Sequence, residues 1–291
     1  MELRQLRYVE AVSRHRHFTR AADELHVAQS ALSHQIRRLE AELGTELFER
    51  TSRSVVTTEA GEAVAARART VLAEVDDVRG EIDELNGLIR GRISVGALLP
   101  AGGVDMPSVV GRFRDAYPGI EIDLHEGTAG DMLRFLADDE LHAAFSLLAW
   151  PVPDGLVGER LSEDELAAVF PPGDAPGRGR VTAKRLLDYP IMLPRSGSAI
   201  KSAADEFFAA AGQPARVALE SGDPFLLRCL VASGFGAAIL PRSLTRREGP
   251  RVEVRGLKPA VRLPVMLLWR EGRRMSPAAR AFIEFVRRES G

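Results

Sequence analysis

Several polar side chains between residues 29 and 37 have the types and the spacing that contact double-stranded DNA. They are Gln29, Ser30, Ser33, His34 and Arg37. At about 100° per residue on a helix, the last four project from one side, and Gln29 lies at the exposed start. Their hydroxyl, amide, imidazole and guanidinium groups can hydrogen-bond to base edges and phosphates. Because residues 25–39 contain no Asp or Glu, the pattern predicts a helix that enters the major groove.

Residues 1–58 have the apolar spacing of three short helices, and the polar face just described belongs to the third. The apolar side of that helix consists of Leu32, Ile36, Leu39 and Leu43. Gly44 follows at the position where a glycine commonly ends a helix. Only residues 26–28 separate the third helix from the second, and a break this short is typical of a helix-turn-helix.

A second acid-free segment, residues 50–58, contains Arg50 and Arg53. It lies within residues 47–57, which have the pattern of two short strands around an arginine-bearing turn. Such a wing would place Arg53 near the adjacent minor groove or its phosphates. The formal net charge of the chain is −2, so the prediction of DNA binding depends on these local basic groupings and not on overall charge.

A long helix is predicted from Ala60 onward, because its apolar residues alternate spacings of four and three. The set is Val64, Ala68, Val71, Val75, Val78, Ile82, Leu85 and Ile89. A heptad seam of this kind buries itself most simply against a second copy of the same helix. The alternative is that the seam packs on its own domain.

After Gly91 the pattern changes to strands that alternate with helices. The expected strands include Ile93–Ala97, Ala143–Leu148 and Val265–Trp269, and the expected helices include Met106–Ala116 and Pro277–Arg288. Such alternation predicts an α/β fold with parallel-rich sheets and helices on both faces.

Composition and cysteine content restrict the class of protein. The chain is 45% hydrophobic and 27% charged, as in ordinary globular proteins. No segment approaches the roughly 18 apolar residues of a membrane span, and the charged N-terminus lacks the apolar core of an export signal. Cys229 is the single cysteine, so no intramolecular disulfide can form. We expect a cytoplasmic protein with no membrane partner.

Signals for metal binding or catalysis are weak. His15 and His17 are close in sequence, but no third ligand accompanies them, and metal sites normally need three or four. Cys229 lies among Leu226, Leu227 and Leu230, which favours a buried, inert thiol. No Ser/His/Asp or paired-carboxylate arrangement stands out. We therefore expect no metal, no cofactor and no enzymatic activity.

The run FTRAADELHVAQSALSHQIRRLEAELGTELFERTSRSVVTTEAGE, residues 18–62, resembles the signature of LysR-type transcriptional regulators. The segments MPSVVGRFRDAYPG and LVASGFGAAILP also fit that family. The resemblance implies a sequence-specific transcription regulator that binds a double-stranded DNA operator, responds to a small-molecule effector and forms dimers or tetramers.

The resemblance also implies the domain organisation. Residues 1–58 would form a winged helix-turn-helix DNA-binding domain, residues 59–90 a dimerising linker helix, and residues 91–291 an effector-binding domain. The last would have two α/β subdomains, as in periplasmic binding proteins. Subdomain I would comprise about 91–161 and 266–291, and subdomain II about 162–265.

By position, the resemblance assigns DNA contacts to Gln29, Ser30, Ser33, His34, Arg37 and the wing's Arg53, and dimerisation to the seam from Val64 to Leu85. It places the effector between the subdomains, on Leu98, Leu99, Pro100, Thr128, Ser196, Ser198 and Phe225. Leu98 and Leu99 replace the small or hydroxyl side chains frequent in the family, which points to a more apolar effector or an altered pocket. Ser198 can hold a ligand carboxylate together with free helix amides, or act as an ordinary N-cap.

Two other classes of protein share part of this pattern. A solute-binding module is supported only by residues after 91, and the missing export signal opposes it. An enzyme on a doubly wound scaffold, fused to DNA-binding helices, has no catalytic residues to support it. The sequence patterns leave open the effector, the operator sequence, and whether transcription is activated or repressed.

Overall fold

The computed structural model describes residues 1–50, 55–85, 89–97, 104–149, 151–272 and 275–290. Its contacts divide the chain into two compact units, and each is described by itself. The first unit comprises Met1–Gly91 with Asp138–Glu140. The second comprises Arg92–Ala137 with Leu141–Gly291.

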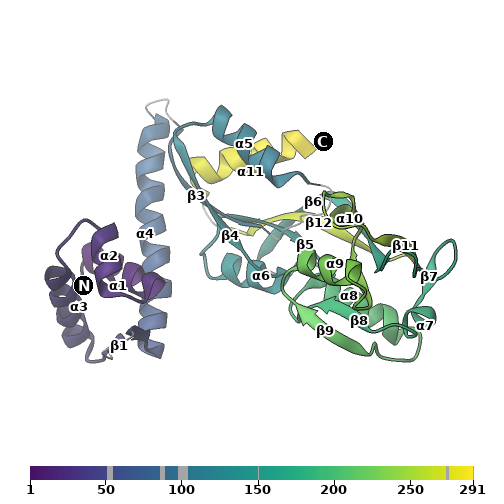
Figure 1. Ribbon diagram of the computed structural model, residues 1–291. Helices are drawn as coiled ribbons and strands as arrows, with labels where there is room; N and C mark the ends of the chain where they lie inside the picture. The colour runs from purple at the N-terminus through teal and green to yellow at the C-terminus, as the bar shows by residue number, and fades with distance from the viewer. Residues whose placement is uncertain (51–54, 86–88, 98–103, 150, 273–274, 291) are drawn as a thin grey trace. The chain divides into compact units, whose positions relative to one another are not determined.

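The first unit begins with three helices and a hairpin (Figure 1). These are α1 (Leu3–His15), α2 (Phe18–Glu24), α3 (Gln29–Leu43), β1 (Phe48–Arg50) and β2 (Val55–Thr57). Apolar side chains from α1, α2, α3 and β1 share one buried core, which includes Val9, Ala21, Ile36 and Phe48. The two strands pair antiparallel, with Phe48 opposite Thr57. The predicted helix-turn-helix and the two strands of its wing are confirmed.

Local interactions explain where α3 ends and how the hairpin is held. Gly44 follows α3 with a left-handed φ of 71°, as its position in the sequence predicted. One carboxylate oxygen of Glu40 accepts the backbone N–H groups of Leu47 and Phe48 at 2.9 and 3.3 Å. This carboxylate therefore joins the end of α3 to the first strand of the hairpin.

The long helix α4 (Glu59–Leu85) follows the hairpin and contains 27 residues. The hydroxyl of Thr58 accepts the N–H of Gly61 at 3.0 Å, which satisfies one free amide of the first turn. Ala65 belongs to the core of the first unit, and α1 packs along α4 (Figure 1). The helix was predicted to include Ile89, which instead lies outside any helix.

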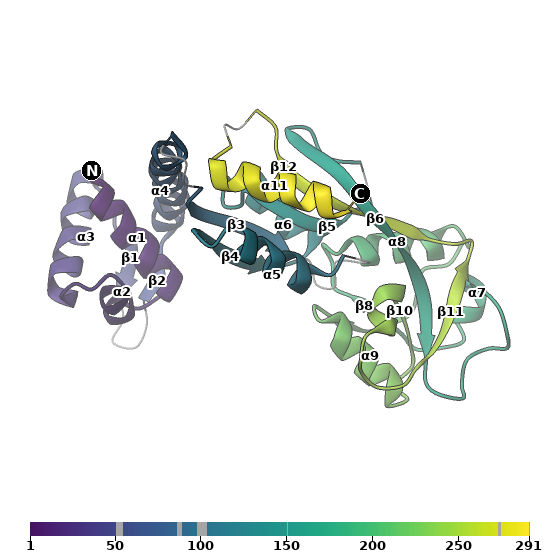
Figure 2. The same ribbon diagram turned by 90° about the horizontal axis from the view of Figure 1, so that it is seen from above.

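The second unit contains a mixed sheet and seven helices in its described residues (Figures 1 and 2). Its strands are β3 (Gly91–Ala97), β4 (Ile120–Glu126), β5 (Ala143–Leu147), β6 (Leu156–Phe170), β7 (Val181–Thr182), β8 (Ile191–Pro194), β9 (Val217–Ser221), β10 (Ala237–Pro241), β11 (Glu253–Lys258) and β12 (Arg262–Arg270). Its helices are α5 (Met106–Ala116), α6 (Ala129–Ala137), α7 (Ala183–Leu186), α8 (Ala199–Ala209), α9 (Pro224–Ala232), α10 (Arg242–Arg246) and α11 (Pro277–Ser290).

Strand order divides this unit into two lobes that share β6 and β12. The order is β4-β3-β5-β12-β6-β10-β8-β9, and β11 pairs with β6 and β7. The first part of β6, Leu156–Glu165, pairs antiparallel with the whole of β12. The last part, Leu166–Phe170, pairs antiparallel with β10 and β11. The lobe with β3, β4 and β5 is here called lobe I, and the lobe with β7 to β11 is called lobe II.

Helices cover both faces of the sheet in each lobe, as predicted. In lobe I, α5 and α11 pack on one face of the sheet and α6 covers the other (Figure 2). On the first face the ring of Phe282 contacts the rings of Phe113 and Phe145. In lobe II, α8 packs on one face and α9 on the other. The expectation of parallel-rich sheets holds for the β3–β5, β10–β8 and β8–β9 pairs. The central strands β6 and β12 are antiparallel, which alternation alone did not predict.

Candidate DNA-binding face and ligand cleft

The outer side of α3 carries exposed polar residues with no acid among them. Gln29, Ser30, His34 and Arg37 are all exposed, and Arg38 lies beside them. Within the described ranges, no ion pair joins His34, Arg37 or Arg38 to a carboxylate. The positive charge on this face is therefore available to a phosphate backbone.

Ser33 departs from the prediction, because it is 5% exposed and does not project from the outer side of α3. It follows Leu32 directly and precedes Ile36 by one helical turn, so it lies on the flank of the apolar stripe. Helix α3 packs on α1 and α2, and a side chain as small as serine is covered at that flank. The Nε atom of Arg37 donates to the carbonyl of Ser33 at 3.4 Å.

The wing residue Arg53 lies outside the described residues, so its predicted position near DNA is not tested. The strands on either side are in place, and Val55 packs against the core of the first unit.

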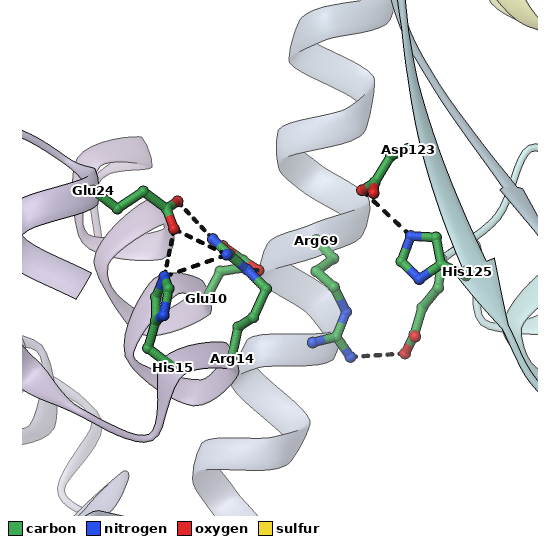
Figure 3. Close-up of polar contacts among 8 residues, drawn as sticks. Glu10, Arg14, His15, Glu24, Arg69, Asp123 and His125 are labelled. Atoms are coloured by element: carbon green, nitrogen blue, oxygen red, sulfur yellow. Dashed lines mark hydrogen bonds and ion pairs between the residues drawn. The ribbon is translucent and has the colours of Figure 1, made fainter. Parts of the chain in front are cut away.

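The two histidines considered as a metal pair have separate structural roles, and Figure 3 shows that of His15. Nδ1 of His17 accepts the backbone N–H groups of Thr19 and Arg20 at 3.2 and 3.4 Å and so caps α2. His15 contacts the carboxylate of Glu24, which also pairs with Arg14. The hydrogen bonds from Arg14, with a smaller contribution from His15, lower the pKa of Glu24 to about 2. Arg14 and His15 are thus committed to a surface ion cluster within the fold.

The heptad seam of α4 is divided between two environments. Val64 packs against the core of the first unit and Ala68 is fully buried, so the alternative of packing within the chain applies to this end. Val71, Val78, Ile82 and Leu85 are 41%, 60%, 55% and 83% exposed. An apolar row this exposed on one helix is typical of a surface covered by another molecule.

A cleft of about 580 Å³ lies where lobes I and II of the second unit meet. It is lined by Ala97, Glu126, Gly127, Thr128, Gly130, Asp131, Pro194, Arg195, Ser196, Gly197, Ser198, Ile200, Gly222 and Pro224. These residues come from the carboxyl ends of β3, β4, β8 and β9 and the starts of the helices that follow. Ligands of open α/β sheets bind at such strand-end crevices.

Three residues predicted for the effector line this cleft: Thr128, Ser196 and Ser198. Leu98, Leu99 and Pro100 lie outside the described residues. Phe225 is not among the described residues that line the cleft. Pro224 begins α9 at the cleft. Successive side chains of a helix are rotated by about 100°, so the side chain of Phe225 points away from the cleft. Phe225 is 42% exposed and lies near Gly249 instead.

The hydroxyl and carboxyl groups on the lobe I side form a closed local network. The N–H and hydroxyl of Thr128 both donate to one oxygen of Asp131, at 2.9 and 2.8 Å, and the Asp131 N–H donates back to the hydroxyl at 3.2 Å. The two bonds from Thr128 hold the pKa of Asp131 below its usual range. This reciprocal arrangement caps α6 and fixes its first turn at the cleft.

The lobe II side presents the start of α8 and one arginine. The N–H of Ile200 donates to the hydroxyl of Ser198 at 3.2 Å, so the N-cap interpretation of Ser198 is correct. Gly197 has a φ of 85°, which favours glycine, and its carbonyl accepts the N–H of Gly130 from lobe I at 3.2 Å. Arg195 is exposed, and its guanidinium lies over Gly222, at 1.9 Å from where a Cβ would stand.

The cleft residues that the sequence patterns did not identify include Glu126, Arg195, Gly222 and Pro224. Each directly follows or ends a strand, or begins a helix, at the same edge of the sheet. Their positions after predicted strands were a usable signal, because strand-end loops of such sheets line ligand sites.

Comparison with known proteins identifies the family to which this architecture belongs. The family model of the bacterial regulatory helix-turn-helix protein, lysR family, matches residues 3–62, and the LysR substrate binding domain matches residues 86–291. The chain belongs to the LysR family. It is therefore a DNA-binding transcription regulator with an effector-binding domain, and members of the family form oligomers.

Individual LysR family members are similar over the whole length. The RuBisCO operon transcriptional regulator of Allochromatium vinosum is 31% identical over 300 residues, which cover 100% of this chain and 97% of that one. The DNA-binding transcriptional dual regulator OxyR of Escherichia coli strain K12 is 30% identical over 275 residues, with 94% and 90% covered.

Solved structures share the fold. The crystal structure of CbnR, a LysR family transcriptional regulator, matches with a TM-score of 0.74 at 24% identity and covers all of both chains. A full-length OxyR variant from Pseudomonas aeruginosa matches with a TM-score of 0.71 at 25% identity, over 100% of this chain and 94% of that one. In the described part of this LysR family chain, no helix is both long and apolar enough to cross a membrane.

Proposed function

We propose that this LysR family regulator contacts its operator through the exposed face of α3 and is switched by a small molecule in the cleft between lobes I and II. The observation that carries the DNA-binding part is the charge of Arg37 and Arg38, which no described carboxylate pairs with, on the second helix of a helix-turn-helix. By contrast, the equally basic Arg14 is fully engaged by Glu10 and Glu24.

The exposed apolar row of α4 supports a further part of this proposal, that two chains pair through this helix. The exposed row Val71, Val78, Ile82 and Leu85 would bury itself against the same row of a second copy. Two copies would then present two α3 helices to one duplex. A twofold-symmetric reader predicts an operator of two related half-sites about one helical turn, roughly 34 Å, apart or a multiple of it.

The effector part of the proposal depends on the cleft. Its polar groups, Thr128, Ser196 and Arg195, converge on a volume in the range of small-molecule sites, roughly 300–1,000 Å³. A ligand that contacts both lobes stabilises one relative orientation of them and shifts the population toward it. A change in lobe orientation, passed on through oligomer contacts, would alter the spacing of the DNA-reading helices.

The same proposal includes statements about enzymatic activity, cellular compartment and disulfide formation. We infer that the chain is not an enzyme, because its relatives are transcription regulators. A protein that binds an operator acts in the compartment that holds the DNA, which we take to be the cytoplasm. Cys229, half-buried on α9, is the single cysteine, so no disulfide switch within one chain is available.

DNase I footprinting with the full-length protein tests the proposal. Genomic fragments selected by the protein should show a protected site with two related half-sites upstream of a gene. Protection should change in extent or position when a cleft ligand is added. Absence of any protected site, at protein concentrations that already bind DNA non-specifically, would contradict the DNA-binding function.

A further inference from the structure

The cleft between lobes I and II contains the guanidinium of Arg195, whose charge acts on the Asp131 carboxylate across the cleft and contributes to lowering its pKa. No hydrogen bond or ion pair connects Arg195 to another side chain among the residues that the structure describes. Its guanidinium is laid over the backbone of Gly222, which lines the same cleft. A Cβ at position 222 would collide with it, at 1.9 Å from one Nη atom. The glycine therefore provides the space in which this cation faces the cleft.

The start of α8 lies beside this guanidinium. The first turn of a helix leaves amides without intrahelical acceptors, and only that of Ile200 is capped by a side chain, Ser198. The hydroxyl-bearing Ser196 also lines this wall. An arginine fork, a hydroxyl and helix amides together are the donors that a carboxylate accepts from. This wall of the cleft therefore favours a carboxylate.

Two carboxylates line the cleft on the lobe I side, and only one of them accepts hydrogen bonds from other described residues. Asp131 is occupied by Thr128, whose N–H and hydroxyl both donate to it. Glu126, the last residue of β4, is exposed and has no hydrogen bond or ion pair to any described residue. Among the described residues, the cleft thus contains one cation on lobe II and one anion on lobe I that form no hydrogen bond or ion pair within the chain.

We propose that the effector is a small zwitterion of the α-amino acid type, with its carboxylate on Arg195 and the start of α8 and its ammonium on Glu126. This inference rests on the proposed function of the cleft as the effector site. A simple carboxylate would satisfy Arg195 but add a second negative charge beside Glu126 and Asp131. A simple amine would leave Arg195 unmatched. A zwitterion matches both lobes at once, so it binds best when the lobes are held together.

Calorimetric titration of the full-length protein tests the charge pairing. The proteinogenic L-amino acids are first screened by thermal shift. The best of them is then compared with its carboxylate lacking the amino group and its amine lacking the carboxyl group; for L-leucine these are 4-methylpentanoate and 3-methylbutylamine. Each lost charge-assisted contact should weaken binding by about tenfold or more.

Two variants assign the contacts to the two lobes. Arg195→Gln should weaken the amino acid and the carboxylate analogue alike. Glu126→Gln should weaken the amino acid about tenfold or more but leave the carboxylate analogue unchanged or tighter. Matched controls are Glu121→Gln, on the same strand β4 but outside the cleft, and Arg216→Gln, an exposed arginine just before β9.

The outcomes separate this inference from the proposed function. If the carboxylate analogue binds as tightly as the amino acid, or Glu126→Gln changes neither, the zwitterion assignment is wrong and the cleft remains a site for anions. If no amino acid raises the melting temperature at millimolar concentration, the assignment is also wrong. Failure of the footprint with the wild-type protein would instead remove the proposed function itself.

Discussion

The carboxylate of Glu24 on α2 accepts two hydrogen bonds from the guanidinium of Arg14 on α1, at 2.7 and 2.9 Å (Figure 3). Through Nε, the same guanidinium donates to Glu10 at 3.0 Å. Helix α2 is the first helix of the helix-turn-helix pair, and Ala21 on its inner side packs into the core with Val9 of α1. The ion cluster therefore links α1 and α2 at the surface, in addition to their packing in the core.

Glu24→Gln should loosen α2. At pH 7 the amide keeps the shape of the side chain but loses the charge, so we expect the DNA-binding domain to lose about 1 kcal/mol of stability. That figure is small because the side chain of Glu24 is 40% exposed and solvent screens its ion pairs. Urea unfolding followed by far-ultraviolet circular dichroism measures the difference. Glu121→Gln, whose partner Arg92 lies 3.5 Å away at a very exposed site, is the control and should change nothing.

The same pair predicts a pH dependence. The pKa of Glu24 is lowered from 4.5 to about 2 in the folded chain, so folding favours the ionised form. Its contribution to stability is complete above pH 4.5, decreases as the pH falls below that value, and is lost below about pH 2. The stability difference between wild type and Glu24→Gln should therefore shrink over this interval. A difference that stays constant down to pH 2 would show that the charge of Glu24 does not stabilise the domain.

Gly61→Ala should disrupt the junction between α4 and the hairpin. A Cβ at this position would lie 2.0 Å from the carbonyl oxygen of Leu47 and 2.7 Å from a methyl carbon of Thr57. Since one of these atoms is backbone, the chain just before β1 must move, and overpacking of this kind costs about 1–3 kcal/mol. Amide hydrogen exchange across β1 and the first turns of α4 should become faster.

Gly111→Ala is the matched control, because it also replaces a helical glycine. Nothing lies within 4 Å of its added Cβ in α5. Alanine is the better helix former, so this variant should gain up to about 1 kcal/mol. Equal effects of the two substitutions would mean that the close approach at Gly61 has no energetic consequence.

Sequence patterns predicted the elements whose determinants are local. The stripe around Ile36 defined α3, Gly44 marked its end, and a short turn joined it to α2. The strand β6 was missed because its residues, LVGERLSEDELAAVF, are heavily charged along a stretch that links the two lobes. Its first part is not buried in either core, so it lacks the apolar signal by which a buried strand is recognised.

The missed parts of the sites depend on contacts between distant segments. Ser33 is one residue away from the apolar stripe, and only the packing of α3 on its neighbours shows that it is covered. Arg195 and Glu126 are 69 residues apart in sequence and belong to different lobes. They line the same cleft because β4 in lobe I and β8 in lobe II both end there, and no periodicity in the chain encodes this.

Substitution of the exposed seam should separate the chains of the oligomer. Val78 and Ile82 are 60% and 55% exposed on α4, and an Asp at either position would place a charge in an apolar interface. Since neither side chain supports the core of its own chain, the variants should stay folded. Sedimentation velocity should then report a monomer of 31.7 kDa.

Arg67→Asp provides the control for this experiment. It introduces the same side chain at an exposed polar position of α4 that is not part of the seam. It should leave the oligomer intact. A Val78→Asp protein that sediments like the wild type would place the interface elsewhere.

Arg37→Ala and Ser33→Ala should have different effects on operator binding. Arg37 is exposed and has no carboxylate partner in the described part of the chain, so its loss should weaken binding by about 1–3 kcal/mol. Ser33 is buried, so its loss should alter domain stability and leave affinity nearly unchanged at equal folded fraction. Fluorescence anisotropy with a labelled operator measures both, and Lys184→Ala, a cation of the second unit, is the control.

The salt dependence of these affinities shows what Arg37 contacts. A phosphate contact releases bound counterions, so removing it lowers the slope of log affinity against log salt by about one. A base contact changes the affinity for the operator and leaves that slope, and the affinity for unrelated DNA, unchanged. If Ser33→Ala weakens binding as much as Arg37→Ala does, the face that enters the groove includes the flank of α3 on which Ser33 lies, and α3 must turn to expose it.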